Sequence, residues 1–122
     1  MFQFACCITF GMNIGNFLQL QGTFKCNREL GATTEEQTVS VMNRIKTQLE
    51  GMGMSVGDII KMQAFLVAPE GEAVDFDGFM KGYSQFFGTE EQPNLPVRSA
   101  MVVDALVNPG WLVELEVTAV RP

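Results

Sequence analysis

The chain has 122 residues, 47% of them hydrophobic, and this length and composition suit one domain built around one core. Its 8 Lys and Arg against 14 Asp and Glu give a net charge of -6, which disfavours nucleic acid as a partner because phosphates bind clustered basic residues. The absence of histidine excludes Ser-His-Asp and Cys-His systems and most catalytic zinc sites. Chemistry is left to carboxylates, cysteines, one tyrosine, lysines, arginines, backbone amides and water, so we expect no cofactor and no metal.

The N-terminal segment, MFQFACCITFGMN, is apolar but has the features of neither a signal peptide nor a membrane helix. No basic residue precedes its apolar run, and that run is far shorter than the ~20 residues that cross a bilayer. The cysteines Cys6, Cys7 and Cys26 form an odd set, two of them adjacent, without the spacing of a disulfide framework. We therefore expect an edge strand or a shifted start, no membrane partner, and a cytoplasmic location.

A strand and a helix are predicted in the next part of the chain. Residues 16–24, NFLQLQGTF, alternate apolar and polar side chains around a glycine, which indicates a strand that ends in a bend. In ATTEEQTVSVMNRIKTQLEGMG, Thr34 with Gln37 three residues on predicts a capping box. One apolar stripe consists of Val41, Met42, Ile45, Leu49 and Met52. Gly51 or Gly53 is expected to end this helix.

A second strand and a second helix follow. DIIKMQAFLV, residues 58–67, is predicted as a strand with apolar residues on both faces. In DFDGFMKGYSQFFG, Asp75 is the expected N-cap, and apolar side chains recur at helical spacing. These are Phe76, Phe79, Met80, Tyr83, Phe86 and Phe87. Core packing explains them better than a stacking platform does. Gly78 and Gly82 each cost about 1 kcal/mol of helix stability relative to alanine, so we expect close packing against the sheet there.

The chain ends in two predicted strands, RSAMVVDAL and WLVELEVTAV, which the Pro-Gly of VNPG is expected to join as a hairpin. The order of elements predicts an α+β domain over residues 1–122, with one mixed sheet and two helices. Both faces of the strand after Arg98 are largely apolar, whereas two helices can cover only one face. The uncovered face predicts contact with another chain, and we expect a closed homo-oligomer.

Arg98 and Glu114 are the residues that best suit a functional site. A guanidinium at the entrance of an apolar strand can hold a carboxylate through two parallel hydrogen bonds. The alternatives for Arg98 are a salt bridge to Asp104 or Glu114, or a solvated strand end. Glu114 and Glu116 share one face of the last strand. A solvated face explains both, or one of them orients water or moves a proton in a cleft between subunits.

The segment PVRSAMVVDALVNPGWLVELEVTAV resembles the C-terminal signature of the RidA/YjgF family of small trimeric proteins. The residues that carry the match are Pro96, Arg98, Ser99, Leu106, Glu114, Glu116 and Ala119. GNFLQLQG is similar to the glycine-asparagine turn and strand of that family, and both helical segments resemble its helices. The resemblance covers residues 15–121 and leaves residues 1–14 as a divergent N-terminal segment.

This resemblance implies a chorismate-mutase-like subunit with both helices on one face of the sheet, and a homotrimer with clefts between its subunits. Family members hydrolyse 2-imino acids and their enamine tautomers, such as 2-aminoacrylate, to 2-keto acids and ammonia. The resemblance implies that Arg98 holds the substrate carboxylate and that Glu114 lies near the imine nitrogen and the attacking water. It places the backbone of Gly22, with Gln21 beside it, in the pocket wall. The chain is thus expected to be an imine deaminase.

The sequence departs from the family pattern at four pocket positions. They are Ile8 for a tyrosine, Gln21 for a serine, Lys81 for an asparagine in the second helix and Ala100 for a cysteine. These changes keep the arginine but alter the pocket walls. The alternative function is therefore a protein that binds a small carboxylate, such as a 2-keto acid, in the same cleft without catalysis. A ribonuclease, the older description of similar sequences, requires RNA affinity that falls steeply with salt, and we expect none.

Overall fold

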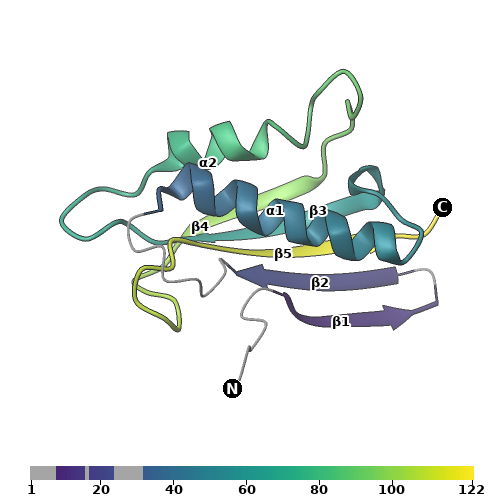
Figure 1. Ribbon diagram of the computed structural model, residues 1–122, viewed down its shortest axis with the longest axis horizontal. Helices are drawn as coiled ribbons and strands as arrows, with labels where there is room; N and C mark the ends of the chain where they lie inside the picture. Colours follow the sequence, from purple (N-terminus) through teal and green to yellow (C-terminus); the bar gives the residue numbers. More distant parts are fainter. Residues whose placement is uncertain (1–7, 16, 24–31) are drawn as a thin grey trace.

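Two helices cover one face of a five-stranded sheet in the computed structural model, which describes residues 8–15, 17–23 and 32–122 (Figure 1). In chain order the elements are β1 (Ile8–Ile14), β2 (Phe17–Thr23), α1 (Thr34–Gly51), the 3-10 turn η1 (Val56–Asp58), β3 (Ile59–Leu66), α2 (Phe76–Tyr83), β4 (Val97–Val102) and β5 (Val113–Val120). The strands lie in the order β1-β2-β5-β3-β4, and only β3 and β4 pair in parallel. The predicted α+β class and mixed sheet are confirmed.

The predicted hairpin of the last two strands is wrong. β4 pairs with β3 at one edge of the sheet, whereas β5 lies between β2 and β3. The crossover from β3 through α2 returns the chain in the same direction, which makes β4 parallel to β3. β4 also ends at Val102, so the predicted strand through Leu106 is too long. Every second residue of β5 is buried under the helices. This burial agrees with a central position in the sheet, where β5 pairs with a strand on each side.

Helix α1 begins one residue earlier than the sequence pattern predicts. Its N-cap is Thr33, whose hydroxyl accepts a hydrogen bond from the Glu36 N–H at 3.2 Å. The Glu36 carboxylate accepts one from the Thr33 N–H at 3.0 Å, which completes the capping box. The predicted pair of Thr34 and Gln37 is wrong because both side chains are buried against the protein. The apolar stripe is confirmed, since Val41, Met42, Ile45 and Leu49 are fully buried.

Gln37 ties α1 to the segment that leads into β5. Its side chain is only 2% exposed. The Nε2 group donates to the Gly110 carbonyl at 2.9 Å and to the Ala32 carbonyl at 3.2 Å, and Oε1 accepts from the Leu112 N–H at 2.8 Å. A buried amide with every group paired fixes the position of the backbone that it contacts. Gln37 therefore helps to set where β5, and with it Glu114, enters the sheet.

Replacing Gln37 by leucine is expected to lower the free energy of unfolding by about 1 to 3 kcal/mol, because the buried Leu112 N–H loses its acceptor, whereas the carbonyl of the exposed Gly110 can pair with water. Urea unfolding followed by circular dichroism measures the change. Gln48→Leu is the matched control, because Gln48 is exposed on the same helix, and a surface change of this kind alters stability by about 0.5 kcal/mol or less. Equal losses in the two variants would contradict the role given to Gln37.

Helix α2 approaches α1 closely at Gly82. Asp75 is its N-cap as predicted, with Oδ1 accepting from the Gly78 N–H at 2.8 Å. A Cβ at Gly82 would lie 2.8 Å from the Thr38 Cβ and 3.1 Å from the Glu35 carbonyl oxygen, both in α1. A Cβ at Gly78 would collide with the capping carboxylate of Asp75 itself. The expectation that the sheet requires these glycines is thus corrected.

The core lies between the two helices and the sheet face beneath them. Residues of β3 and β5 line this face in alternation: Met62, Ala64, Leu66, Val113, Leu115, Val117 and Ala119 are all buried. No helix of the described residues covers the opposite face, which carries Gln63, Phe65, Ser99, Met101, Glu114, Glu116 and Thr118. At the β4 edge the apolar side chains of Val97 and Val102 are 69% and 65% exposed. The predicted uncovered face therefore exists, with acidic residues among the apolar ones.

Candidate ligand site at Arg98

Arg98 lies on the helix side of β4, with its guanidinium under α2. The register pairs it with Met62, a core residue of β3, and paired residues of neighbouring strands share a face. The guanidinium carbon is 4.6 Å from the ring centroid of Tyr83, 5.3 Å from that of Phe79 and 5.9 Å from that of Phe76. These distances are within the range of cation–π attraction. The surroundings of the cation are therefore aromatic.

One helix supplies all of these neighbours because its apolar residues recur at helical spacing. The rings of Phe76 and Phe79 are 5.9 Å apart, those of Phe79 and Tyr83 also 5.9 Å, and Tyr83 stacks on Phe87 at 4.7 Å. Phe79, Tyr83 and Phe87 are buried, which confirms the prediction that they belong to the core. Phe76 is 43% exposed and lies at the outer end of the row. The row thus runs from the interior to the surface beside Arg98.

Both salt bridges considered for Arg98 are wrong. Asp104 is exposed in the connection after β4. Glu114 pairs with Phe65 on the uncovered face of the sheet, whereas Arg98 is on the helix side. The guanidinium instead donates from Nη1 to the sulfur of Met80 at 3.1 Å, and a thioether is only a weak acceptor. Neither the sulfur nor the rings neutralise the positive charge, so its N–H groups suit an incoming carboxylate.

Tyr83 stays neutral next to this cation. Burial raises the pKa of Tyr83 above its ordinary value of 10.0, although the charge of Arg98 and its hydrogen bond to the phenol act in the opposite direction. A phenol with a raised pKa remains protonated at neutral pH. Tyr83 therefore contributes a ring face and a neutral hydroxyl to the site, and no negative charge that would compete with a ligand.

The other predicted site residues lie in the neighbouring strands β2 and β5, which β3 separates from β4 and Arg98. Gly22 in β2 pairs with Leu115, and the next residue, Thr23, pairs with Glu114. Gln21 pairs with Glu116 in the same register. One chain thus brings Gly22, Gln21 and Glu114 together in adjacent strands. It does not bring Arg98 to them, because β3 separates β4 from β5 and the two charged side chains project from opposite faces.

The positions that depart from the family pattern do not all lie at the site. Ile8 in β1 pairs with Gly22, and Ala100 lies two residues beyond Arg98 on the same face of β4. Lys81 is exposed, and its neighbour Met80 is the residue of α2 whose side chain contacts Arg98. Met80 is thus the α2 residue at the guanidinium, and a place for Lys81 in a pocket wall stays a prediction. The helical stripe that begins at Phe76 already contains Met80, and this was the signal available in the sequence.

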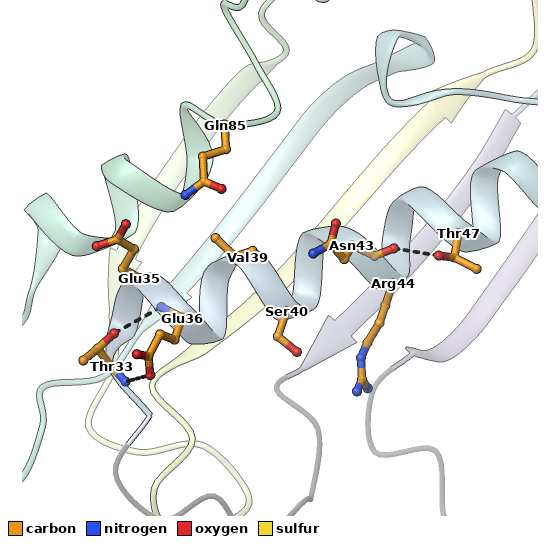
Figure 2. Close-up of a pocket in the computed structure, with 9 residues that line it drawn as sticks. All are labelled: Thr33, Glu35, Glu36, Val39, Ser40, Asn43, Arg44, Thr47 and Gln85. Atoms are coloured by element: carbon orange, nitrogen blue, oxygen red, sulfur yellow. Dashed lines mark hydrogen bonds between the residues drawn. The ribbon is translucent and has the colours of Figure 1, made fainter.

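A separate open hollow of about 850 Å³ follows the outer side of α1 (Figure 2). Its lining residues are Thr33, Glu35, Glu36, Val39, Ser40, Asn43, Arg44, Thr47 and Gln85. Figure 2 shows Thr33 and Glu36 hydrogen-bonded to each other in the capping box. The Thr47 hydroxyl donates to the Asn43 carbonyl at 2.9 Å. None of the predicted site residues is among these, and the candidate site stays at Arg98.

Neither a cluster of metal ligands nor a membrane-spanning helix is found in the described part of the chain. Residues 8–15, 17–23 and 32–122 contain no group of three acidic or thiol side chains arranged to hold a metal ion. None of the helices described is both long and apolar enough to span a bilayer. The cysteines Cys6, Cys7 and Cys26, which the sequence assigned to a reducing environment, lie outside the described residues.

Comparison with known proteins gives one consistent result. Residues 9–121 match the family model described as Endoribonuclease L-PSP. The chain is 30% identical over 114 residues to the 2-iminobutanoate/2-iminopropanoate deaminase of Escherichia coli K12, covering 91% of this chain and 84% of that protein. The crystal structure of E. coli TdcF with bound serine superposes with a TM-score of 0.77 at 28% identity, over 100% of this chain and 97% of TdcF. Rv2704 of Mycobacterium tuberculosis, a member of the YjgF family, shares the fold with a TM-score of 0.71 at 24% identity, over 90% of this chain and 83% of Rv2704.

Proposed function

Because the chain belongs to the RidA/YjgF family, we propose that it hydrolyses reactive 2-imino acids and their enamine tautomers to 2-keto acids and ammonia. The observation that carries this proposal is the Arg98 guanidinium, which contacts aromatic rings and a thioether sulfur and so keeps its charge available for a substrate carboxylate. A relative with 30% identity is named for this reaction. The bound serine of TdcF supports a small ligand with a carboxylate.

The reaction needs few groups because an imine carbon is already electrophilic. In the proposal, Arg98 holds the carboxylate with two N–H groups and fixes C2 next to a water molecule. Glu114 accepts a proton from the water as its oxygen bonds to C2 of the protonated imine and the C=N electron pair moves to nitrogen, which gives a neutral carbinolamine. The same carboxyl returns this proton to nitrogen and then takes the hydroxyl proton as the C–N bond breaks, so that ammonia leaves and the C2 oxygen becomes the keto oxygen.

The proposal places the reaction between two copies of the chain. Arg98 and Glu114 project from opposite faces of one sheet, so a small ligand that touches both must take them from different subunits. The exposed apolar side chains of Leu95, Val97 and Val102 at the β4 edge suit such a contact. A closed ring of three subunits, the homotrimer that the resemblance implies, repeats this contact without leaving an unpaired edge.

Light scattering at micromolar concentration is expected to give a mass of about 40 kDa, three times the 13.5 kDa of one chain. Val97→Lys places a charge on the exposed edge and should shift the mass toward that of one chain. Lys46→Ala, an exposed change on α1, should leave the mass unaltered. A wild-type mass of 13.5 kDa would exclude a site shared between subunits.

An assay with a trapping reagent tests the activity directly. An amino-acid oxidase generates the imine, semicarbazide converts it to a semicarbazone that absorbs in the ultraviolet, and the protein competes by hydrolysing the imine first. We expect the protein to lower the initial rate of semicarbazone formation and to raise the amount of free 2-keto acid in equal measure. An unchanged rate at a saturating protein concentration would reject the proposed activity.

A second candidate function is the binding of a 2-keto acid without catalysis. The contact that favours it is that of Met80 with Arg98, because a thioether at the cation offers no hydrogen bond donor to a substrate. Calorimetry with pyruvate distinguishes the two functions. Binding that requires Arg98, together with an unchanged rate of semicarbazone formation, would favour the binding protein over the enzyme.

A further inference from the structure

The surface next to the Arg98 guanidinium is apolar and partly exposed to solvent. Phe79 and Tyr83 are buried and close the inner side of the guanidinium. Phe76 is 43% exposed at 5.9 Å from the guanidinium carbon, and Met80 is partly buried with its sulfur 3.1 Å from Nη1. Phe76 and Met80 are four residues apart, so they lie side by side on the helix. They form an apolar wall, named here the Phe76–Met80 wall, at the open side of the cation.

A carboxylate that binds Arg98 must share the guanidinium with this wall. A carboxylate oxygen is a much stronger acceptor than a thioether, so it takes over the Nη1 hydrogen that points at Met80. The flexible methionine side chain can then move along the ligand, because it has three rotatable bonds and a polarizable sulfur. The carbon atoms attached to C2 come to lie beside the ring of Phe76 and the Met80 methyl group.

From this arrangement we propose that the site selects 2-imino acids with large apolar side chains, branched or aromatic, over those with a methyl or an acidic side chain. The proposal rests on the proposed function, in which Arg98 holds the carboxylate. A large apolar side chain removes the exposed part of Phe76 from water, which a methyl group does not. An acidic side chain would lose its water against a thioether and a ring that cannot pair with its charge.

The proposal is tested by comparing imines of leucine, alanine and aspartate, each made by an oxidase and trapped by semicarbazide. We expect kcat/KM for the leucine imine to exceed that for the alanine imine about 10- to 100-fold, the range that one to a few methylene groups give in an apolar pocket. The aspartate imine should be the poorest of the three substrates. Equal kcat/KM values for leucine and alanine imines would overturn the proposal.

Variants of the wall show whether these two residues cause the preference. Phe76→Ala and Met80→Ala should each reduce the ratio of leucine to alanine kcat/KM about tenfold, mainly through the leucine imine. Gln85→Ala is the control, since Gln85 is exposed just beyond the end of α2, lines the separate hollow of Figure 2 and should leave the ratio unchanged. A wild-type ratio in both wall variants, with near-ultraviolet circular dichroism that shows a native fold, would overturn the assignment to the wall.

Failure of this proposal can be distinguished from failure of the proposed function. Calorimetry with 4-methyl-2-oxopentanoate and pyruvate measures the same preference without any turnover. If Arg98→Ala leaves the binding of both keto acids unchanged, Arg98 is not the carboxylate site. Both the proposed function and the proposed selection for apolar side chains are then rejected. If both acids bind in an Arg98-dependent way with equal affinity, the proposed function stands and only the selection for apolar side chains is rejected.

Discussion

Replacing Arg98 by alanine is expected to lower kcat/KM for imine hydrolysis about 100-fold or more, because the substrate loses both charge-assisted hydrogen bonds that hold its carboxylate. Arg98→Lys keeps the charge but lacks the planar pair of N–H groups, and we expect it to recover only part of the loss. The trapping assay measures both. The effect should appear largely in KM for the lysine variant, since a single hydrogen bond still attracts the carboxylate without fixing its orientation.

Arg44→Ala provides a matched control for the removal of a guanidinium. Arg44 lies on α1 and lines the hollow of Figure 2, which includes none of the predicted site residues, and its replacement should leave kcat/KM unchanged. Arg98→Ala also removes a cation from the rings of α2, so its stability in urea must be measured alongside. A folded Arg98→Ala protein that competes with semicarbazide as well as the wild type would reject Arg98 as the carboxylate site.

Replacing Glu114 by glutamine is expected to lower kcat about 100-fold with little change in KM, because an amide keeps the size of the side chain but cannot accept and return a proton. Single-turnover and steady-state measurements of ammonia release separate the two parameters. The effect on keto-acid binding should be small, since the carboxylate of the ligand contacts Arg98. A large loss of binding with an unchanged kcat would instead make Glu114 a residue of the ligand contact.

Glu116→Gln is the matched control for this variant. Glu116 lies on the same strand and the same face, two residues further along β5, and pairs with Gln63 of β3. The substitution removes the same charge from the uncovered face, so it reproduces any general electrostatic effect. We expect kcat within about twofold of the wild type, as for a substitution outside a proton-transfer path. Equal losses in Glu114→Gln and Glu116→Gln would contradict the assigned role.

The elements of this fold could be predicted because their signals are local. Asp75 caps α2 through the Gly78 N–H, and the stripe from Val41 to Leu49 is buried, both as the spacing indicated. The order of the strands depends on contacts between segments far apart in the chain. The Pro-Gly before β5 is compatible with a hairpin between β4 and β5. β5 instead lies at the centre of the sheet under the helices, because burial there is more favourable than pairing with β4 at the edge.

The candidate site could be predicted in its residue types but not in its arrangement. Arg98 was recognisable as a cation at a strand entrance, whereas its face depends on the register with Met62. The α2 side chain that contacts Arg98 is that of Met80, four residues after Phe76 in the apolar stripe of the sequence. The separation of Arg98 and Glu114 on opposite faces follows only from the pairing of all three strands.

In the proposed site one ligand contacts Arg98 of one subunit and Glu114 of another, and mixed oligomers test this arrangement. Arg98→Ala and Glu114→Gln proteins are each expected to be nearly inactive. The two variants are mixed in equal amounts, unfolded and refolded together. A site between two subunits is then intact where the Glu114→Gln subunit contributes its native Arg98 and the neighbouring Arg98→Ala subunit contributes its native Glu114. Random pairing in a ring gives this combination about one time in four, so we expect recovery of about a quarter of wild-type activity. No recovery in oligomers shown by mass spectrometry to contain both variants would contradict this arrangement.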